Sequence, residues 1–190
     1  VISSQTELSS EPADTDEFLV SDAGTLKRID YSLIKGGGIT EADMYRLHTT
    51  ETSSSLTKLT NWERVDDASF GKIGTGVSVS SGNFTFGATG LYQLIFNAET
   101  AHEGATGYVH TYLKGTTDNF SNEDDLAQSN NYHDAGHVGY SSISSFFNCT
   151  NTSTHKVACY FNTSQSSAGV NGNSTHNRTC LSIVRLGDSV

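Results

Sequence analysis

The residues best suited to hold a metal ion lie in one acidic segment, residues 116–128, which reads TTDNFSNEDDLAQ. Carboxylate and amide oxygens are the ligands that calcium prefers, and Asp118, Asp124 and Asp125 are the candidates here. The segment lacks the spacing of an EF-hand loop. We therefore expect a solvated acidic loop and no cofactor, with a calcium site as the alternative.

Two histidines, His133 and His137, stand four residues apart in the segment NNYHDAGHVGY, residues 130–140. On a helix this spacing would place both rings on one face, as a zinc or iron site needs. The intervening Asp134 and Gly136 favour a turn, so exposed loop histidines are the simpler interpretation. A metal site becomes possible in a homotrimer, because one histidine from each chain would supply three ligands on the threefold axis.

Motifs that carry catalysis are missing from the sequence. It has no Gly-X-Ser-X-Gly elbow, Walker loop, HExxH or CxxC. The glycine-rich segment 71–79, GKIGTGVSV, has neither the glycine spacing of a phosphate loop nor a helix after it. Asp66 and Asp67 fit a turn better than a catalytic pair. Since no general acid and base can be assigned, we expect a protein that is not an enzyme.

Two polar segments, 130–140 and 164–177, combine tyrosine, histidine, asparagine and aspartate, and we expect both to be loops. Such side chains form hydrogen bonds and stack on rings, which suits contact with a sugar or a protein receptor. The candidate binding residues are Tyr132, His133, Asp134, His137, Tyr140, Asn171, Asn173 and His176.

The charge of the chain excludes two classes of partner. Its 21 Asp and Glu outnumber 11 Lys and Arg, giving a net charge of -10. Nucleic acid and anionic membrane surfaces both require clustered positive charge, so neither is an expected partner. No apolar run approaches the roughly 18 to 20 residues of a membrane-spanning helix, so we expect no membrane insertion.

All three cysteines, Cys149, Cys159 and Cys180, lie in the last quarter of the chain. An odd number argues against a fully paired disulfide framework. Buried free thiols are the simpler interpretation, and a bridge between Cys149 and Cys159 across a hairpin stays open.

The elements that must position these residues fall into two parts, divided at the triple glycine 36–38. In segment 1–38, alternation on both sides of residues 22–25 predicts a hairpin of strands 18–20 and 26–29. A unit this small is marginal alone, so we expect it to pack on copies of itself or on a preceding shaft.

Residues 39–190 alternate between apolar and polar side chains and sustain no helical period, which predicts an all-β sandwich or jelly roll. Only 35% of the residues are hydrophobic, so either a core shared between subunits or many short strands is expected. The expected strands are 44–50, 62–65, 77–80, 83–86, 90–99, 107–114, 138–148, 155–161 and 178–186.

Strand 90–99 is apolar on both faces over part of its length, because Leu91 and Ile95 alternate with Tyr92, Leu94 and Phe96. A central strand covered on both sides within one chain would have this pattern. So would a strand whose second face is buried by a neighbouring subunit. The sequence does not separate the two arrangements.

Segment 82–100, GNFTFGATGLYQLIFNAET, resembles the aromatic-strand, glycine and tyrosine signature of the complement globular-head and tumour-necrosis-factor jelly rolls. The run NWERVDDASFGKIGTGVSVSSGNFTF and the ending TCLSIVRLGDSV resemble heads of this kind in virion proteins of marine phages, particularly cyanophages. This resemblance covers residues 44–190. Residues 7–34 are similar to connecting modules of phage fibre proteins, through a less specific motif.

The resemblance implies a ten-stranded homotrimeric jelly-roll head with its functional surface in loops and no enzymatic activity. In that superfamily the strand that matches residues 90–99 packs at the trimer core, which makes Tyr92, Leu94 and Phe96 the candidates for subunit contact. The implied protein is assembled in the host cytoplasm and exposed on the virion. It would be the distal part of a tail fibre or similar appendage.

In this interpretation segment 1–38 joins other virion proteins, and the head binds a host surface glycan or protein. A head fibre or capsid decoration protein is the alternative within the virion. A glycan-degrading tailspike enzyme is the alternative from another class, and it would need paired carboxylates along a groove.

Overall fold

The structure is a computed structural model that describes residues 10–34, 38–102 and 106–190. By its internal contacts the chain divides into an N-terminal unit, Val1–Gly38, and a head, Ile39–Val190. Gly36 and Gly37, where the sequence suggested a boundary, lie outside the described residues. Among the described residues, no helix is both long and apolar enough to cross a membrane.

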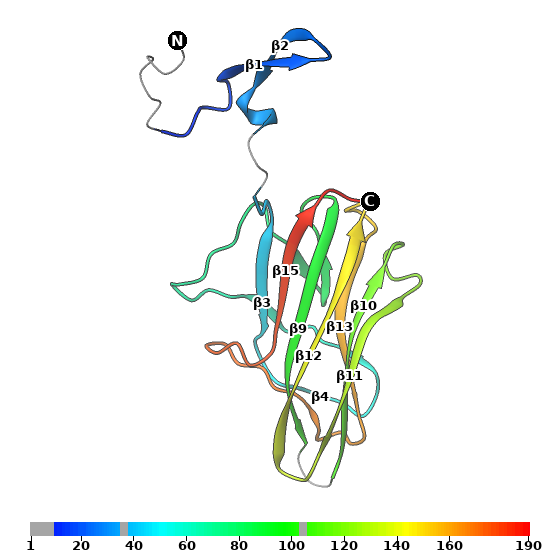
Figure 1. Ribbon diagram of the computed structural model, residues 1–190. Coiled ribbons are helices and arrows are strands. Elements are labelled where there is room, and N and C mark those ends of the chain that lie inside the picture. The colour runs from blue at the N-terminus through cyan, green and yellow to red at the C-terminus, as the bar shows by residue number, and fades with distance from the viewer. Residues whose placement is uncertain (1–9, 35–37, 103–105) are drawn as a thin grey trace. The chain divides into compact units, whose positions relative to one another are not determined.

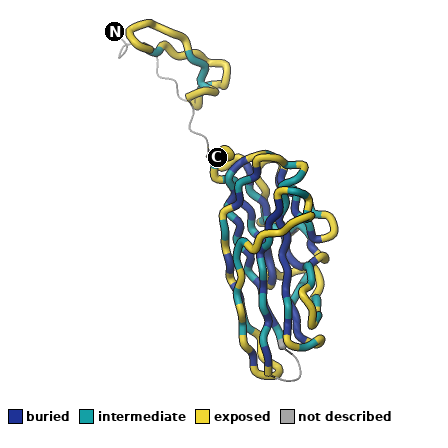
Figure 2. The backbone as a smooth tube through the Cα atoms, turned by 90° about the vertical axis from the view of Figure 1, so that its right-hand side faces the viewer, coloured by how far each residue is buried: buried dark blue, intermediate teal, exposed yellow. Residues whose placement is uncertain are grey.

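The N-terminal unit is an antiparallel hairpin of β1 (Glu17–Asp22) and β2 (Thr25–Asp30), followed by the short 3-10 helix η2 (Tyr31–Leu33). Ala23 and Gly24 both have positive φ, at 48° and 82°, as a two-residue type I′ turn requires. The predicted hairpin is therefore confirmed. Its described residues are exposed or half-buried throughout, so this unit has no interior of its own (Figure 2).

Two antiparallel sheets form the head (Figure 1). One runs β6-β3-β15-β9-β12 and the other β7-β8-β13-β10-β11, while the two-residue strands β4, β5 and β14 extend them. The strands are β3 (Ala42–Leu47), β4 (Glu51–Thr52), β5 (Thr57–Lys58), β6 (Trp62–Arg64), β7 (Ser78–Ser80), β8 (Asn83–Thr85), β9 (Gly90–His102), β10 (Gly107–Thr116), β11 (Asp124–His133), β12 (His137–Cys149), β13 (Lys156–Thr163), β14 (Gly169–Val170) and β15 (Cys180–Gly187). This arrangement confirms the predicted all-β jelly-roll sandwich.

The core lies between the two sheets and is built from alternate residues of each strand. Trp62 and Phe84 meet edge to face with ring centroids 5.3 Å apart, and Trp62 meets Phe96 at 6.2 Å. All three cysteines are buried free thiols, so Cys149 and Cys159 are not bridged.

One of the two apolar faces of strand β9 is buried within the single chain. Tyr92, Leu94 and Phe96 are at most 1% exposed and belong to the core of a single chain. Their burial needs no neighbouring subunit, because the second sheet already covers them. Leu91 and Ile95 point the other way and are half-buried.

Strand β11 was not predicted. The sequence suggested loops over 116–128 and 130–140, but residues 124–133 pair with β10 and lead through a turn into β12. β11 is the edge strand of its sheet, and its core-facing positions hold Ala127, Ser129 and Asn131 in place of large apolar side chains, so the apolar alternation that marks a strand is lost.

Candidate functional site

The predicted binding residues lie on two structures of the head, the β11–β12 hairpin and the segment 171–178 before β15. The hairpin turn lies at the end of the head opposite the C-terminus (Figure 1). Strand pairing places Tyr140 of β12 opposite Glu99 of β9, and the backbone N–H of Asn171 donates to the Glu99 carbonyl at 2.8 Å. Glu99 therefore joins the two structures.

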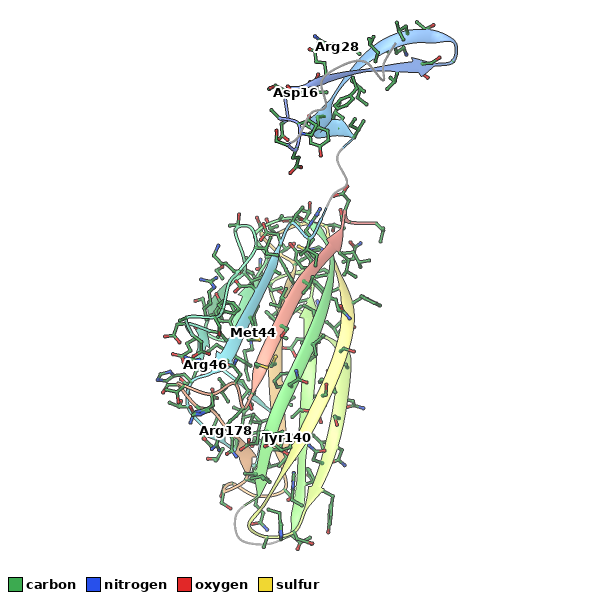
Figure 3. The ribbon with its side chains drawn as sticks, turned by 60° about the vertical axis from the view of Figure 1, so that its left-hand side comes forward. Asp16, Arg28, Met44, Arg46, Tyr140 and Arg178 are labelled. Atoms are coloured by element: carbon green, nitrogen blue, oxygen red, sulfur yellow. The ribbon has the colours of Figure 1, made fainter. Side chains whose placement is uncertain are left out.

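The Glu99 carboxylate is the centre of this cluster, although only 6% of the residue is exposed. It accepts the Tyr140 hydroxyl at 2.9 Å and the Asn171 side-chain amide at 2.8 Å, and it pairs with Arg178 at 3.0 Å. Figure 3 shows Tyr140 and Arg178 side by side on the lower half of the head. The hydrogen bond to this carboxylate raises the pKa of Tyr140.

This cluster fixes the positions of the predicted loops, because a buried carboxylate must be matched by donors. The sequence analysis missed Glu99 and Arg178. Each stood at the end of an expected strand, 90–99 and 178–186, and that placement was the only signal that the two charges would meet at one end of a sheet.

His133 is buried rather than exposed. It is 5% exposed, its Nε2 lies 2.8 Å from Thr100 Oγ1, and its ring fills the space beside Gly139. A Cβ on Gly139 would lie 2.2 Å from the imidazole. The expectation that His133 is an exposed loop residue is wrong, because it ends β11 with its side chain turned inward; His137, by contrast, is exposed.

The remaining candidates differ in what they offer to a partner. Tyr132 and Tyr140 are 74% and 70% exposed. Asn173 shapes its own turn, because its Oδ1 accepts the backbone N–H groups of Thr175 at 2.8 Å and His176 at 2.9 Å. Three further candidates are also exposed: Asp134, His137 and His176.

The acidic candidates do not converge on one point. Asp118 accepts the backbone and side-chain N–H groups of Asn122 at 2.9 and 2.7 Å, and these bonds lower its pKa. Asp125 pairs with Lys114 at 2.7 Å, and Asp124 is exposed at the start of β11. No three His, Cys, Asp or Glu side chains are grouped to hold a metal ion anywhere in the described part of the chain.

Other carboxylates of the head also have partners. Asp66 and Asp67, expected in a turn, pair with the guanidinium of Arg46, which is 1% exposed. Buried Asp43 pairs with Arg64 and accepts the backbone N–H of Val77 at 2.9 Å. These groups hold loops against the sandwich, as hydrogen-bonded buried charges commonly do.

One face of the head exposes apolar side chains. The outward side of β12, β9 and β15, here called the open face, includes Val138, Phe146 and Leu186, which are 56%, 62% and 51% exposed. Half-buried Ile95 and Val184 face the same way, with Gln93 between Phe146 and Val184. Several exposed apolar side chains on one sheet face commonly mark a site of association.

Solved structures share this fold at low sequence identity. Murine APRIL aligns with a TM-score of 0.55 and 13% identity over 77% of this chain and 98% of its own. Eiger TNF from S. frugiperda gives 0.54 and 12% over 80% and 96%. PRD1 vertex protein P5 gives 0.51 and 16% over 80% and 100%. No family model and no curated protein sequence matches the chain. The likeness to these three is one of fold.

Proposed function

We propose that this chain is a structural protein of a phage virion, the distal part of a tail fibre or a similar appendage. Its head would associate as a homotrimer through the open face and bind the host surface through the hairpin end. The open face carries this proposal, because it exposes apolar side chains that a second copy can cover. The fold shared with PRD1 vertex protein P5 is compatible with a virion protein.

The charged groups of the head support binding rather than catalysis. A glycan-degrading enzyme needs two carboxyl groups roughly 5 to 9.5 Å apart on a groove, one of them free to give up a proton. Among the described residues, the buried carboxylates Glu41, Asp43 and Glu99 each accept hydrogen bonds from their own donors. These hydrogen bonds hold loops in place.

A head fibre or capsid decoration protein is the second candidate. It is favoured by one observation, that a neighbour in fold is a vertex protein. The two candidates differ in where the N-terminal unit attaches. Gold labelling of this chain on virions would place it on the tail in the first case and on the capsid shell in the second.

The trimer is tested by a change on the open face. Phe146→Ser and Ile95→Lys should convert a trimer into monomers, because they place polar groups in an apolar contact. Light scattering measures the mass, and Tyr132→Ser is the matched control, an aromatic side chain on the opposite sheet that is 74% exposed against 62% for Phe146. A monomeric mass for the unchanged chain at micromolar concentration would refute self-association.

Host binding is tested by incubating the purified chain with host cells and with isolated envelope polysaccharide. We expect the chain to be retained while the polysaccharide keeps its length. Progressive shortening would establish the tailspike enzyme instead. No retention, together with a label on the capsid shell, would transfer the assignment to decoration.

A further inference from the structure

We propose that the outward face of β10 and β11 is a binding platform for an uncharged saccharide chain. This inference rests on the proposed host-binding function and moves its ligand contact from the loops to a sheet face. The platform consists of three residues from each strand: Tyr108, His110 and Tyr112 of β10, and Gln128, Asn130 and Tyr132 of β11.

Strand pairing brings these six side chains together in three cross-strand pairs. Tyr108 stands opposite Tyr132, His110 opposite Asn130, and Tyr112 opposite Gln128. Alternate residues share one side of a sheet, and Val109 and Leu113, which alternate with the platform residues of β10, are fully buried. All six side chains therefore point away from the core, and each is either half-buried or exposed. The result is a stripe of rings on β10 beside amide groups on β11.

The rings form a continuous row. Tyr108 and His110 have centroids 4.6 Å apart, and His110 and Tyr112 have centroids 6.1 Å apart. A hydrogen bond of 3.1 Å between His110 Nδ1 and the Tyr112 hydroxyl fixes two of the rings relative to each other. Side chains that are ordered before binding lose less conformational entropy when a ligand arrives.

A cavity of about 330 Å³ opens on the same face, lined by His110, Gln128, Ser129 and Asn130. This volume is at the lower end of the roughly 300 to 1,000 Å³ of small-molecule sites. Three of the four lining residues belong to the platform. The cavity would therefore hold one ring-sized group while the aromatic row supports its neighbours.

The chemistry of the platform matches a sugar. Aromatic faces pack against the C–H faces of a ring, while amides and phenols both donate and accept hydrogen bonds, as hydroxyl groups do. None of the six residues is aliphatic, in contrast to the open face with its Val138, Phe146 and Leu186. A protein partner would bury more aliphatic surface on the open face than on the platform.

The charge pattern selects an uncharged ligand. None of the six residues carries a carboxylate, amine or guanidinium group. At the border, Lys114 pairs with Asp125 at 2.7 Å and Glu123 at 3.3 Å, so two carboxylates balance the charge of the lysine nearest the platform on β10. The net charge of -10 on the whole chain also disfavours polyanions.

Binding of the full chain to immobilised polysaccharides tests the proposal. The probes are neutral mannan, dextran, laminarin and galactan, with alginate and polygalacturonate as acidic counterparts. We expect binding to at least one neutral probe and to neither acidic probe. His110→Ala and Asn130→Ala should weaken it by at least about tenfold, because each removes a platform contact. Urea unfolding checks that each variant is folded, and Gln128→Ala replaces any that is not.

His48→Ala and Asn61→Ala are the matched controls, an exposed histidine and an exposed asparagine next to β3 and β6 and outside both proposed contact surfaces, and should leave binding unchanged. Binding to acidic probes alone, binding to none, or unaltered binding by the platform variants would overturn the platform. If host cells still retain the chain in any of those cases, the proposed function stands with a loop contact. If host cells do not retain the unchanged chain, the proposed function itself is refuted.

Discussion

At the scale of single residues, ion pairs of buried side chains join segments of the head that are distant in sequence. Glu99, Asp43 and Arg46 are each at most 6% exposed, and each pairs with groups from segments distant in sequence. The partner is the more exposed member of each pair, and removing it would leave the other charge buried without its partner, which is unfavourable. Only 35% of the residues are hydrophobic, so the loops have little apolar surface to anchor them. These charged contacts hold the loops in place instead.

A buried phenol gives a pH-dependent prediction. Tyr92 is 1% exposed, and burial raises its pKa to about 12, while its hydroxyl donates to the Ala88 carbonyl at 2.8 Å. The pKa is higher in the folded state than the value near 10 of an unfolded chain, so this contribution is complete below pH 10. It is lost as the pH rises from 10 to 12, and it amounts to about 2–3 kcal/mol.

Urea unfolding between pH 9 and 12 measures this effect. Tyr92→Phe should flatten the alkaline loss of stability, since it removes the titrating group. Exposed Tyr132→Phe is the control and should follow the unchanged chain. Equal alkaline slopes for all three proteins would contradict the assignment to Tyr92.

At the scale of elements, tight turns set the register of the hairpins. Ser81 and Gly82 join β7 to β8 with φ of 49° and 76°, the conformation of a two-residue type I′ turn. A Cβ on Gly82 would lie 2.3 Å from the Leu59 carbonyl oxygen. The turn therefore needs glycine both for its backbone conformation and for the close approach of a neighbouring segment.

Gly82→Ala should lower the free energy of unfolding by at least about 1–2 kcal/mol, because the left-handed conformation and the close contact both oppose a Cβ. Urea denaturation measures the change. Gly71→Ala, at a position where a Cβ would meet nothing within 4 Å, should change stability by less than about 0.5 kcal/mol. A loss at Gly82 no larger than at Gly71 would show that the turn tolerates a side chain.

At the scale of the whole molecule, the two units differ in what holds them together. The head has a contiguous core of buried side chains from both of its sheets. The N-terminal unit leaves Leu19, Leu26 and Leu33 between 67% and 74% exposed, so its hairpin has little apolar burial to stabilise it. We expect this unit to gain stability from copies of itself or from another virion protein.

A chain of residues 39–190 should therefore fold on its own. We expect one cooperative thermal transition, with a midpoint within a few degrees of the full chain, because the core lies within the head. Circular dichroism follows the transition. A non-cooperative transition in the truncated chain would show that the head depends on residues 1–38.

The sequence alone determined the features that depend on local pattern. Alternation predicted the all-β head and most of its strands, and turn residues predicted the hairpin around Ala23 and Gly24. Tyr108, His110 and Tyr112 occupy every second position of the expected strand 107–114, which places them on one face, although their pattern was not recognised as a binding surface from the sequence.

Only the tertiary structure decided the features that depend on long-range pairing. Strand β9 is apolar on both sides, so its inward face was fixed by the second sheet that covers Leu94 and not Ile95. Strand β11 is an edge strand whose polar residues looked like a loop, and pairing with β10 made it a strand. Glu99 and Arg178 are 79 residues apart, and only the folded sheet brings their charges together. Contacts across such separations leave no periodic signal, because they arise between segments and not within one.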